Sequence, residues 1–344
     1  MSLTSSNDTP RRRVLVVGAG GFVGGFAVDE GLKRGYEVWA GVRETTSREY
    51  LTDERIRFVT LSCDDTGTLS RQLETALPPG EKWDYIIYNL GATKCINFAD
   101  FNKINYEYLR NFTTALLQVG IMPDKMLYMS SLSVMGPRNE KDYTPFTPEQ
   151  IPVPDTRYGT SKLKAEMWLA ESGIPSVIFR ATGIYGPRDR DYFLMFKSVK
   201  SGFDFSVGYR RQMLSFIYVT DLTAAMYDAL ENAPAGNTYI IAEERSYSQK
   251  EFRTLCAKAL GKRFVLPVRL PLAIVKAVSA IAEKWGVARM KPSTLNRDKY
   301  RIMRQRNWRA DISKARRDFG FTPRVPLAEG IARAVAWYRD NGWL

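Results

Sequence analysis

The sequence contains no histidine and only three cysteines, and both shortages narrow the chemistry that it can perform. Without histidine, Ser-His-Asp catalysis, Cys-His catalysis and the common zinc sites are excluded, and we expect no metal centre. Cys63, Cys95 and Cys256 are odd in number and far apart, which indicates a reducing compartment, a cytoplasmic location and no disulfide framework. A catalytic proton donor must therefore be Tyr, Lys, Asp, Glu, Cys or water.

Long apolar runs are also missing. Residues 1–13 are polar, so they do not form a signal peptide, and we expect a disordered tail over residues 1–12. Segment 271–285 is mostly apolar, but Lys276 interrupts it and it is too short to span a bilayer. We expect it to form a buried or lid helix. Contact with an apolar substrate or a membrane surface is the alternative.

Acidic residues are outnumbered, since 37 Asp and Glu stand against 50 Lys and Arg, and the formal net charge is +13. Such a charge can indicate nucleic-acid binding. Here the basic residues are scattered, with a local excess only around residues 297–317, and no nucleic-acid-binding motif accompanies them. We therefore expect no nucleic-acid partner. A basic surface also suits an anionic cofactor, a phosphorylated substrate or an anionic membrane surface.

Strand and helix patterns alternate through the first two-thirds of the chain. This repeated β-α-β order predicts an α/β fold, a Rossmann-type doubly wound parallel sheet. The five prolines of segment 136–157 predict an irregular loop. The expected strands are 14–17, 36–42, 56–61, 85–90, 126–129 and 176–180, and the expected helices are 22–34, 99–118 and 158–171.

After the sixth strand the pattern loosens. It predicts a cofactor-binding domain over residues 13–185 and a smaller, mostly helical substrate lobe over residues 186–344, with some chain returning to the sheet. The helices expected in this second part are 192–200, 221–231, 248–260, 271–284 and 327–341.

Glycine is concentrated where the first strand meets the first helix, at Gly18, Gly21 and Gly24. Glycine there permits a tight turn, lets a diphosphate approach the backbone and lets the helix pack close to the strand. The first N–H groups of the helix, at Phe22 and Val23, then face the diphosphate. The spacing therefore predicts a dinucleotide site, with a plain βα turn as the alternative.

The residues after the second and third strands bear on the cofactor. Arg43 follows the second strand, where an arginine favours NADP and a carboxylate favours NAD, so we expect NADP with NAD as the alternative. Asp64 is placed to meet the adenine. Its alternative role is to cap a helix, for which Asp65 and Thr66 compete.

Tyr158 is the only one of the 18 tyrosines with a lysine four residues later, Lys162. On a helix the two side chains project from one face. A phenol titrates near about 10, and we expect the Lys162 ammonium to lower this pKa so that Tyr158 can exchange a proton. A hydroxyl to polarise the same substrate oxygen is offered by Ser130, Ser131 or Ser133, after the fifth strand.

Together these residues resemble the extended short-chain dehydrogenase/reductase superfamily, that is, the NAD-dependent epimerase/dehydratase family. The tail and the apolar segment 271–285 are more similar to the branch of 3β-hydroxysteroid dehydrogenases and dihydroflavonol reductases. The matching motifs follow one another in the family's order: the glycine turn, Asp64, Leu90-Gly-Ala-Thr93, Asn105, Ser130-Ser-Leu-Ser-Val-Met-Gly136, Tyr158-Gly-Thr-Ser-Lys162, Arg180-Ala-Thr-Gly-Ile-Tyr-Gly-Pro187, Phe216-Ile-Tyr-Val-Thr-Asp221, Ala310-Asp-Ile-Ser-Lys-Ala315 and Phe319-Gly-Phe-Thr-Pro323.

The resemblance implies a role for each matching position. Ser131 becomes the catalytic serine, Tyr158 the acid-base and Lys162 its partner. It also implies a homodimer through helices 99–118 and 158–171. The implied cofactor-binding residues are Gly18, Gly21, Phe22, Val23, Gly24, Arg43, Asp64, Asp65, Leu90, Gly91, Ala92, Lys162, Ala181, Gly183 and Ile184. The implied substrate-binding residues are Thr93, Lys94, Ser133, Tyr185, Arg188 and Arg211.

Departures from the family pattern bear on the substrate. Family members that act on nucleotide sugars often have Asn at the position of Gly183 and Arg at that of Leu214, although Arg210 or Arg211 offers a substitute for the latter. A dehydratase usually has an acid near the serine, where this chain has Leu132. We therefore expect an NADP-preferring oxidoreductase that interconverts a secondary alcohol and a ketone. The alternatives are a nucleotide-sugar epimerase or dehydratase with retained cofactor, and a non-catalytic NADP-sensing protein.

Overall fold

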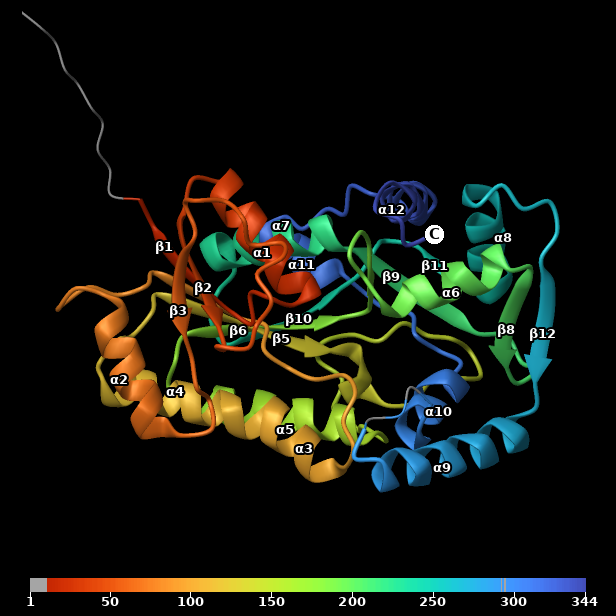
Figure 1. Ribbon diagram of the computed structural model, residues 1–344, viewed down its shortest axis with the longest axis horizontal. Helices are drawn as coiled ribbons and strands as arrows, with labels where there is room; N and C mark the ends of the chain where they lie inside the picture. The colour runs from red at the N-terminus through yellow and green to blue at the C-terminus, as the bar shows by residue number, and fades with distance from the viewer. Residues whose placement is uncertain (1–10, 292, 294) are drawn as a thin grey trace, which may run out of the picture.

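A seven-stranded parallel sheet forms the centre of the computed structural model, which describes residues 11–291, 293 and 295–344 (Figure 1). Residues 1–10, most of the expected tail, lie outside the described residues. The strand order β10-β6-β5-β4-β1-β2-β3 contains the order 3-2-1-4-5-6 of dinucleotide-binding folds, which confirms the expected Rossmann-type sheet. The strands are β1 (Arg13–Val17), β2 (Glu37–Val42), β3 (Arg57–Thr60), β4 (Tyr85–Tyr88), β5 (Lys125–Ser131), β6 (Ser176–Ala181) and β10 (Asn237–Ile241).

Helices cover both faces of this sheet (Figure 1). Val14 and Val16 of β1 pack into the core under one layer, and Leu15 and Val17 pack into the core under the other. Burial on both faces explains why the strands are almost entirely apolar. One layer holds α1 (Phe22–Lys33), α7 (Val219–Asn232) and α11 (Ser313–Phe319), and the other holds α2 (Thr66–Ala76), α4 (Tyr108–Gln118) and α5 (Arg157–Glu171).

The helix expected over 99–118 is interrupted, which the apolar pattern did not predict. It consists of α3 (Phe98–Asn102), a π-helical turn η1 (Lys103–Glu107) and α4. π-helical turns are rare and often occur at functional sites. This one contains Asn105, whose side chain is fully buried.

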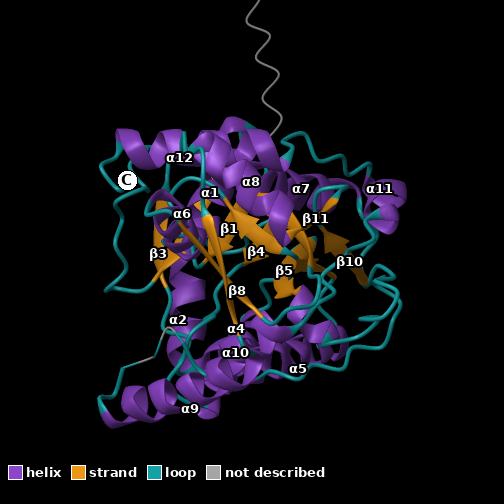
Figure 2. Ribbon diagram, turned by 90° about the vertical axis from the view of Figure 1, so that its right-hand side faces the viewer, coloured by secondary structure: helices purple, strands orange, loops and turns teal. Residues whose placement is uncertain are grey.

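The C-terminal part of the chain contributes to the main sheet and also builds a separate layer. β10, α7 and α11 return to the sheet. Figure 2, which faces the remaining layer, shows α9 and α10 at its lower edge and α8 and α12 at its upper edge. This layer comprises β7 (Gly183–Tyr185), α6 (Asp191–Lys200), β8 (Phe203–Val207), β9 (Met213–Tyr218), β11 (Ser246–Ser248), α8 (Gln249–Ala259), β12 (Leu266–Leu270), α9 (Leu272–Ala288), α10 (Arg297–Arg304) and α12 (Leu327–Asp340).

Two features of the C-terminal part of the chain differ from expectation. The polar sequence around 297–319 forms the helices α10 and α11, which were not predicted. The helix expected over 271–284 is longer, and much of its apolar surface is exposed instead of buried. No helix in the described parts of the chain is long and apolar enough to cross a membrane.

Candidate active site

The glycine turn brings the start of α1 against β1 and the end of β4. Gly18 has a φ of +84°, and a Cβ there would lie 2.9 Å from the backbone nitrogen of Leu90. A Cβ on Gly24 would lie 2.1 Å from the carbonyl oxygen of Gly18. Both contacts are with backbone atoms, which cannot move aside, so these two positions require glycine.

The first turn of α1 is open to a diphosphate. Gly21 is the N-cap residue and offers no side chain to the free N–H groups of the first turn, which include those of Phe22 and Val23. A Cβ on Gly21 would meet only the carbonyl oxygen of Gly18, at 3.4 Å, so the space beside this backbone is not filled. Open N–H groups at a helix N-terminus fit a dinucleotide diphosphate.

Cofactor binding and helix capping were both considered for the acidic residues after β3, and the structure gives the capping role to one of them. Asp65 caps α2, because its carboxylate accepts a hydrogen bond of 2.7 Å from the N–H of Thr68. This capping contact occupies the Asp65 side chain, which the resemblance had assigned to the cofactor. Asp64 instead accepts from the Tyr108 hydroxyl at 2.9 Å and pairs with Lys103 at 2.6 Å. The bond with Lys103 lowers the pKa of Asp64, while Arg43 lies exposed nearby.

Asn105 fixes the loop that follows β4. Its side chain accepts from the N–H of Ala92 at 2.8 Å, donates to the carbonyl of Ala92 at 3.1 Å and donates to Ser161 at 3.0 Å. The loop is thereby held against α5. A Cβ on the neighbouring Gly91 would lie 3.0 Å from both Asn105 and the Lys162 ammonium, so only glycine leaves this space free. Thr93 lies exposed just beyond.

Ser131, Tyr158 and Lys162 converge at the carboxyl edge of the sheet. Ser131 ends β5 beside Ala181 of β6, and its hydroxyl hydrogen-bonds to that of Ser133 at 3.0 Å. Thr156 caps α5. A Cβ on Gly159 would lie 2.5 Å from the carbonyl oxygen of Ser133, so α5 begins in close contact with the residues after β5. Tyr158 lies in this first turn, and its side chain interacts with that of Ser131.

Burial is the largest influence on the pKa values of Tyr158 and Lys162. It raises the pKa of Tyr158 to about 12, although the hydrogen bond with Ser131 opposes this shift. It lowers the pKa of Lys162 to about 7, although the Glu166 charge opposes it. The expectation that Lys162 lowers the pKa of Tyr158 is therefore wrong for the chain by itself. The Lys162 ammonium donates to the carbonyl of Met129 at 2.7 Å and lies 4.8 Å from the ring centre of Tyr128.

A buried ion pair supports this arrangement from below. Arg180 of β6 pairs with Glu166 of α5 at 2.7 Å, one turn after Lys162, and Glu166 also accepts a hydrogen bond from Ser130. Arg180 further donates to the carbonyl of Pro148 at 3.2 Å. The ion pair therefore links α5, two strands and the irregular loop 136–157. The Ser130 hydroxyl is bound to Glu166, so Ser131 and Ser133 remain as the hydroxyls that can polarise a substrate oxygen.

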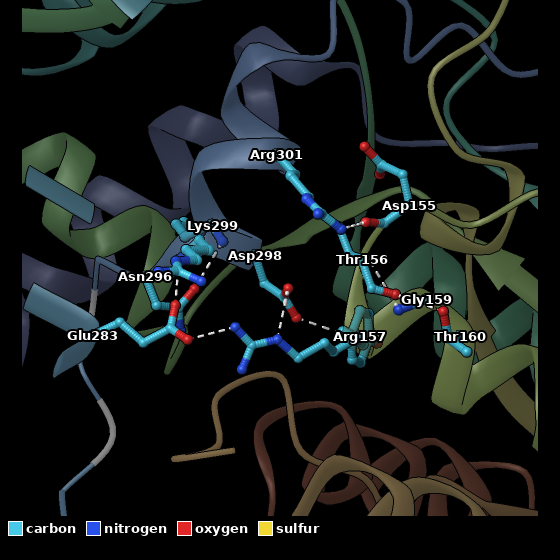
Figure 3. Close-up of polar contacts among 12 residues, drawn as sticks. Asp155, Thr156, Arg157, Gly159, Thr160, Glu283, Asn296, Asp298, Lys299 and Arg301 are labelled. Carbon is cyan, nitrogen blue, oxygen red and sulfur yellow. Dashed lines mark hydrogen bonds and ion pairs between the residues drawn. The ribbon is translucent and has the colours of Figure 1, made fainter. Parts of the chain in front are cut away.

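Arg157 connects the start of α5 to the helices α9 and α10 (Figure 3). Its guanidinium pairs with Asp298 of α10 at 3.5 Å and with Glu283 of α9 at 2.5 Å. Asp298 is buried and also accepts from the N–H of Tyr158 at 3.3 Å. Arg157 is thus held by two charged groups that sequence analysis did not identify, since both come from distant helices, and Glu283 lies 126 residues away.

The expected substrate-binding residues do not all lie together. Lys94 pairs with Asp191, and both lie near the half-buried Lys299 of α10, whose pKa burial lowers. Arg188 instead contacts α1, where it pairs with Asp29 at 3.2 Å and stacks over Phe26 and Tyr50 at 4.6 and 4.5 Å.

The structure corrects one further assignment and leaves another as a prediction. Tyr185 is 1% exposed in the aromatic core of the C-terminal layer, so its assignment to substrate binding is wrong. Its hydroxyl lies where Gly330 of α12 passes closely, and a Cβ on Gly330 would be 2.1 Å from it. Arg211 lies exposed in the loop before β9 and accepts a hydrogen bond from Tyr143 through its carbonyl.

Tyr192 of α6 stands beside β7, at a place that the sequence did not reveal. A Cβ on Gly183 would lie 2.2 Å from the Tyr192 hydroxyl, so this side chain takes the space that a larger residue at 183 would occupy. Ile184 is partly buried next to it. The signal was the glycine itself, because a glycine at this half-buried position implies a close neighbour.

Comparison with known proteins identifies the family. Residues 14–242 match the model of the NAD dependent epimerase/dehydratase family. Uncharacterized protein y4nL of Sinorhizobium fredii (strain NBRC 101917 / NGR234) is 30% identical over 80% of this chain and 80% of its own length. The Arabidopsis thaliana 3beta-hydroxysteroid-dehydrogenase/decarboxylase isoform 1 is 26% identical over 68% of this chain, which spans 57% of that protein. A probable UDP-glucuronate 4-epimerase of Rhizobium meliloti (strain 1021) is 25% identical over 96% of this chain and 97% of its own length.

A solved structure agrees with the fold. The enzyme WbmG of Bordetella bronchiseptica, in complex with NAD and UDP, superposes with a TM-score of 0.75 over 97% of each chain at 21% identity. The family match covers more than half of the chain, and the glycine turn and the Ser131, Tyr158 and Lys162 set lie within it. The chain therefore belongs to the NAD-dependent epimerase/dehydratase family and is an NAD-dependent enzyme.

Proposed function

We propose that this enzyme interconverts a secondary alcohol and a ketone, with Tyr158 as the acid-base. The nicotinamide, when bound, supplies or accepts the hydride. In the reducing direction Tyr158 gives its phenolic proton to the carbonyl oxygen, and Ser131 donates a hydrogen bond to the same oxygen. The contact between the two hydroxyls supports these roles, because one substrate oxygen can then meet both.

The remaining residues of the site would hold the cofactor. The open N–H groups of Phe22 and Val23 fit the diphosphate. Lys162 lies beside the space kept free by Gly91, where it can hold the nicotinamide ribose. Arg43 is exposed after β2, and no ion pair ties down its side chain within the described residues. A free arginine there favours NADP, since the extra phosphate is a strong partner for a guanidinium.

The observation that carries the substrate proposal is the contact of Tyr192 with Gly183. Enzymes of nucleotide sugars often place Asn at this position to hold the sugar diphosphate. In this chain the Tyr192 hydroxyl fills that space, 2.2 Å from where a Cβ would begin. Leu132 is also buried, so no acid stands beside Ser131 to assist an elimination. Both features favour a plain alcohol or ketone over a nucleotide sugar and over dehydration.

A nucleotide-sugar epimerase is the second candidate. The match with the probable UDP-glucuronate 4-epimerase extends over nearly the full length of both chains. An epimerase returns the hydride to its substrate, so it would show no net consumption of cofactor.

We also propose a cytoplasmic homodimer that joins through α4 and α5. Within one chain these two helices pack together through a 2.9 Å hydrogen bond from Trp168 to Thr113.

The test is a substrate screen with two readouts. Purified enzyme would be offered NADPH or NADH with a panel of ketones, and separately UDP-glucuronate, UDP-glucose and dTDP-glucose. The proposal expects steady cofactor oxidation with a ketone, faster with NADPH, and none with the Tyr158→Phe variant. Conversion of a nucleotide sugar without cofactor consumption would overturn it in favour of the second candidate. If the enzyme turns over neither class of substrate, and the Tyr158→Phe variant keeps the protein's biological role, the protein is a non-catalytic sensor.

A further inference from the structure

Helix α9 turns an apolar stripe away from the protein. Ile274, Val278, Ile281 and Trp285 are 55%, 46%, 59% and 61% exposed. Their spacing of four, three and four residues places them along one side of the helix. Its inner side is held by the buried Val275 and Ser279 and by the ion pair of Glu283. The stripe is therefore not a core surface, and no described part of the chain covers it.

The exposed apolar surface continues at both ends of α9. Pro271 joins the helix directly to β12, and a Cβ on Gly208, just after β8, would lie 3.6 Å from Leu272. Figure 1 shows β8 and β12 beside the start of α9. The exposed apolar side chains of these neighbouring segments are Phe203, Phe205, Phe264, Leu266, Leu272, Val287 and Met290. Exposed apolar side chains in this number mark an interaction site.

The charges around the stripe are almost all positive. Over residues 262–291 the one acidic residue is Glu283, and its carboxylate is taken up by Arg157. The basic residues are all exposed: Lys262, Arg263, Arg269, Lys276, Lys284, Arg289 and Lys291. We call the four stripe residues together with these seven basic residues the α9 surface.

We propose that the α9 surface docks on an anionic lipid membrane, with α9 lying parallel to the membrane plane. An apolar stripe flanked by lysine and arginine is the pattern of an interfacial helix, whose apolar side enters the headgroup region. The basic side chains meet anionic headgroups, and their aliphatic stems add apolar contact. Arg289 stacks on Trp285 at 5.0 Å, which places an amphipathic pair at one end of the stripe.

Charge favours lipid over a protein partner. A second copy of the chain would bring the same seven basic side chains face to face across a two-fold axis, and like charges at close range are unfavourable. Protein interfaces are also depleted in lysine, whereas this surface contains four lysines around its apolar stripe. Arg157, the residue before Tyr158, pairs with Glu283 of α9 and so links this helix to the active site. The proposal does not depend on the substrate class.

The test is flotation of the whole protein with vesicles. One set of vesicles is made of phosphatidylcholine alone, and the other is made of an equal mixture of phosphatidylcholine and phosphatidylglycerol. We expect binding to the mixed vesicles only, weakened by added salt. Ile281→Glu should reduce partitioning more than about tenfold, since it places a charge on the side of the helix that would enter the membrane. Lys284→Gln should reduce it about fivefold.

Matched variants control for fold and for general charge. Ile151→Glu changes a more exposed isoleucine in a loop, and Lys33→Gln removes a lysine of α1 whose side chain is 80% exposed. Both should bind like the unaltered protein, and all variants should keep its thermal midpoint. The proposal is overturned if mixed vesicles do not bind, or if Ile281→Glu binds as well as Ile151→Glu. It is also overturned if Ile281→Glu converts a lipid-free oligomer to a monomer, because a second copy then covers the stripe.

Discussion

The main sheet and the separate C-terminal layer are stabilised by different kinds of core. The sheet is packed on both faces with mainly aliphatic side chains, among which aromatic ones are interspersed. Its polar groups at the carboxyl edge are tied to the backbone, as Lys162 is to Met129 and Asn105 to Ala92. The C-terminal layer has an aromatic core, and its helix α9 is apolar toward solvent. The polar groups of the candidate active site are thus fixed at the sheet edge, while the C-terminal layer combines an aromatic core with an exposed apolar helix.

The sharpest test of this division compares a tyrosine of each part. Tyr158→Phe should lower kcat by about 10²–10⁴, because the proton donor is lost. Tyr192→Phe should mainly raise KM, because it removes a hydroxyl beside Gly183 without touching the proton donor. Steady-state kinetics with the substrate found by the screen would measure both. A larger loss of kcat for Tyr192→Phe than for Tyr158→Phe would place the chemistry in the C-terminal layer and break the comparison.

The second test compares two ion pairs, one in each part. Arg180→Met should destabilise the protein by about 3–5 kcal/mol, because it leaves the Glu166 carboxylate buried without a partner. Arg333→Met in α12 breaks the exposed pair with Glu329 and should cost less than about 1 kcal/mol. Urea unfolding would give both values. Equal effects would mean that the Arg180 side chain is not enclosed as described.

The third test follows the buried lysine with pH. Lys162 has a pKa of about 7 when folded and 10.5 as an ordinary lysine, so the unfolded chain binds its proton more strongly. The ammonium therefore costs stability, most fully below pH 7, and this cost fades as the pH rises toward 10.5. Lys162→Met should be more stable than the unaltered protein by several kcal/mol near pH 7, since each full unit of pKa is worth about 1.4 kcal/mol.

Thermal or urea unfolding of both proteins between pH 6 and 9.5, without cofactor, would measure this gap. It should narrow steadily above pH 7. A gap that does not change with pH would mean that Lys162 keeps its ordinary pKa in the folded chain.

The smallest expected effect concerns cofactor choice. Arg43→Ala should reduce the preference for NADPH over NADH about tenfold, as expected for the loss of a charge-assisted hydrogen bond. Arg48→Ala removes an exposed arginine that instead stacks on Phe58 at 4.1 Å, and it should leave the preference unchanged. The ratio of kcat/KM for the two cofactors measures this. An unchanged ratio in Arg43→Ala would remove the basis for the NADP proposal.

The sequence predicted the sheet well because its strands are short apolar runs that need no information from elsewhere in the chain. It also predicted that Ser131, Tyr158 and Lys162 belong together, since they follow neighbouring strands or share a helix. It could not predict the partners of Arg157, because Glu283 and Asp298 come from distant helices. It misplaced Tyr185 for a related reason. A tyrosine in an apolar strand looks the same whether it faces a cleft or a core.

The burial of Lys162 has a consequence for a chain that lacks histidine. Enzymes usually sense pH near neutrality through imidazole. In this chain the groups that titrate in the same pH range are Lys162, with a pKa of about 7, and the buried Asp189, whose pKa is raised by burial to about 6. As the medium becomes slightly acidic, Lys162 gains a positive charge beside the position where an anionic dinucleotide would lie, and Asp189 loses a negative one at the start of α6.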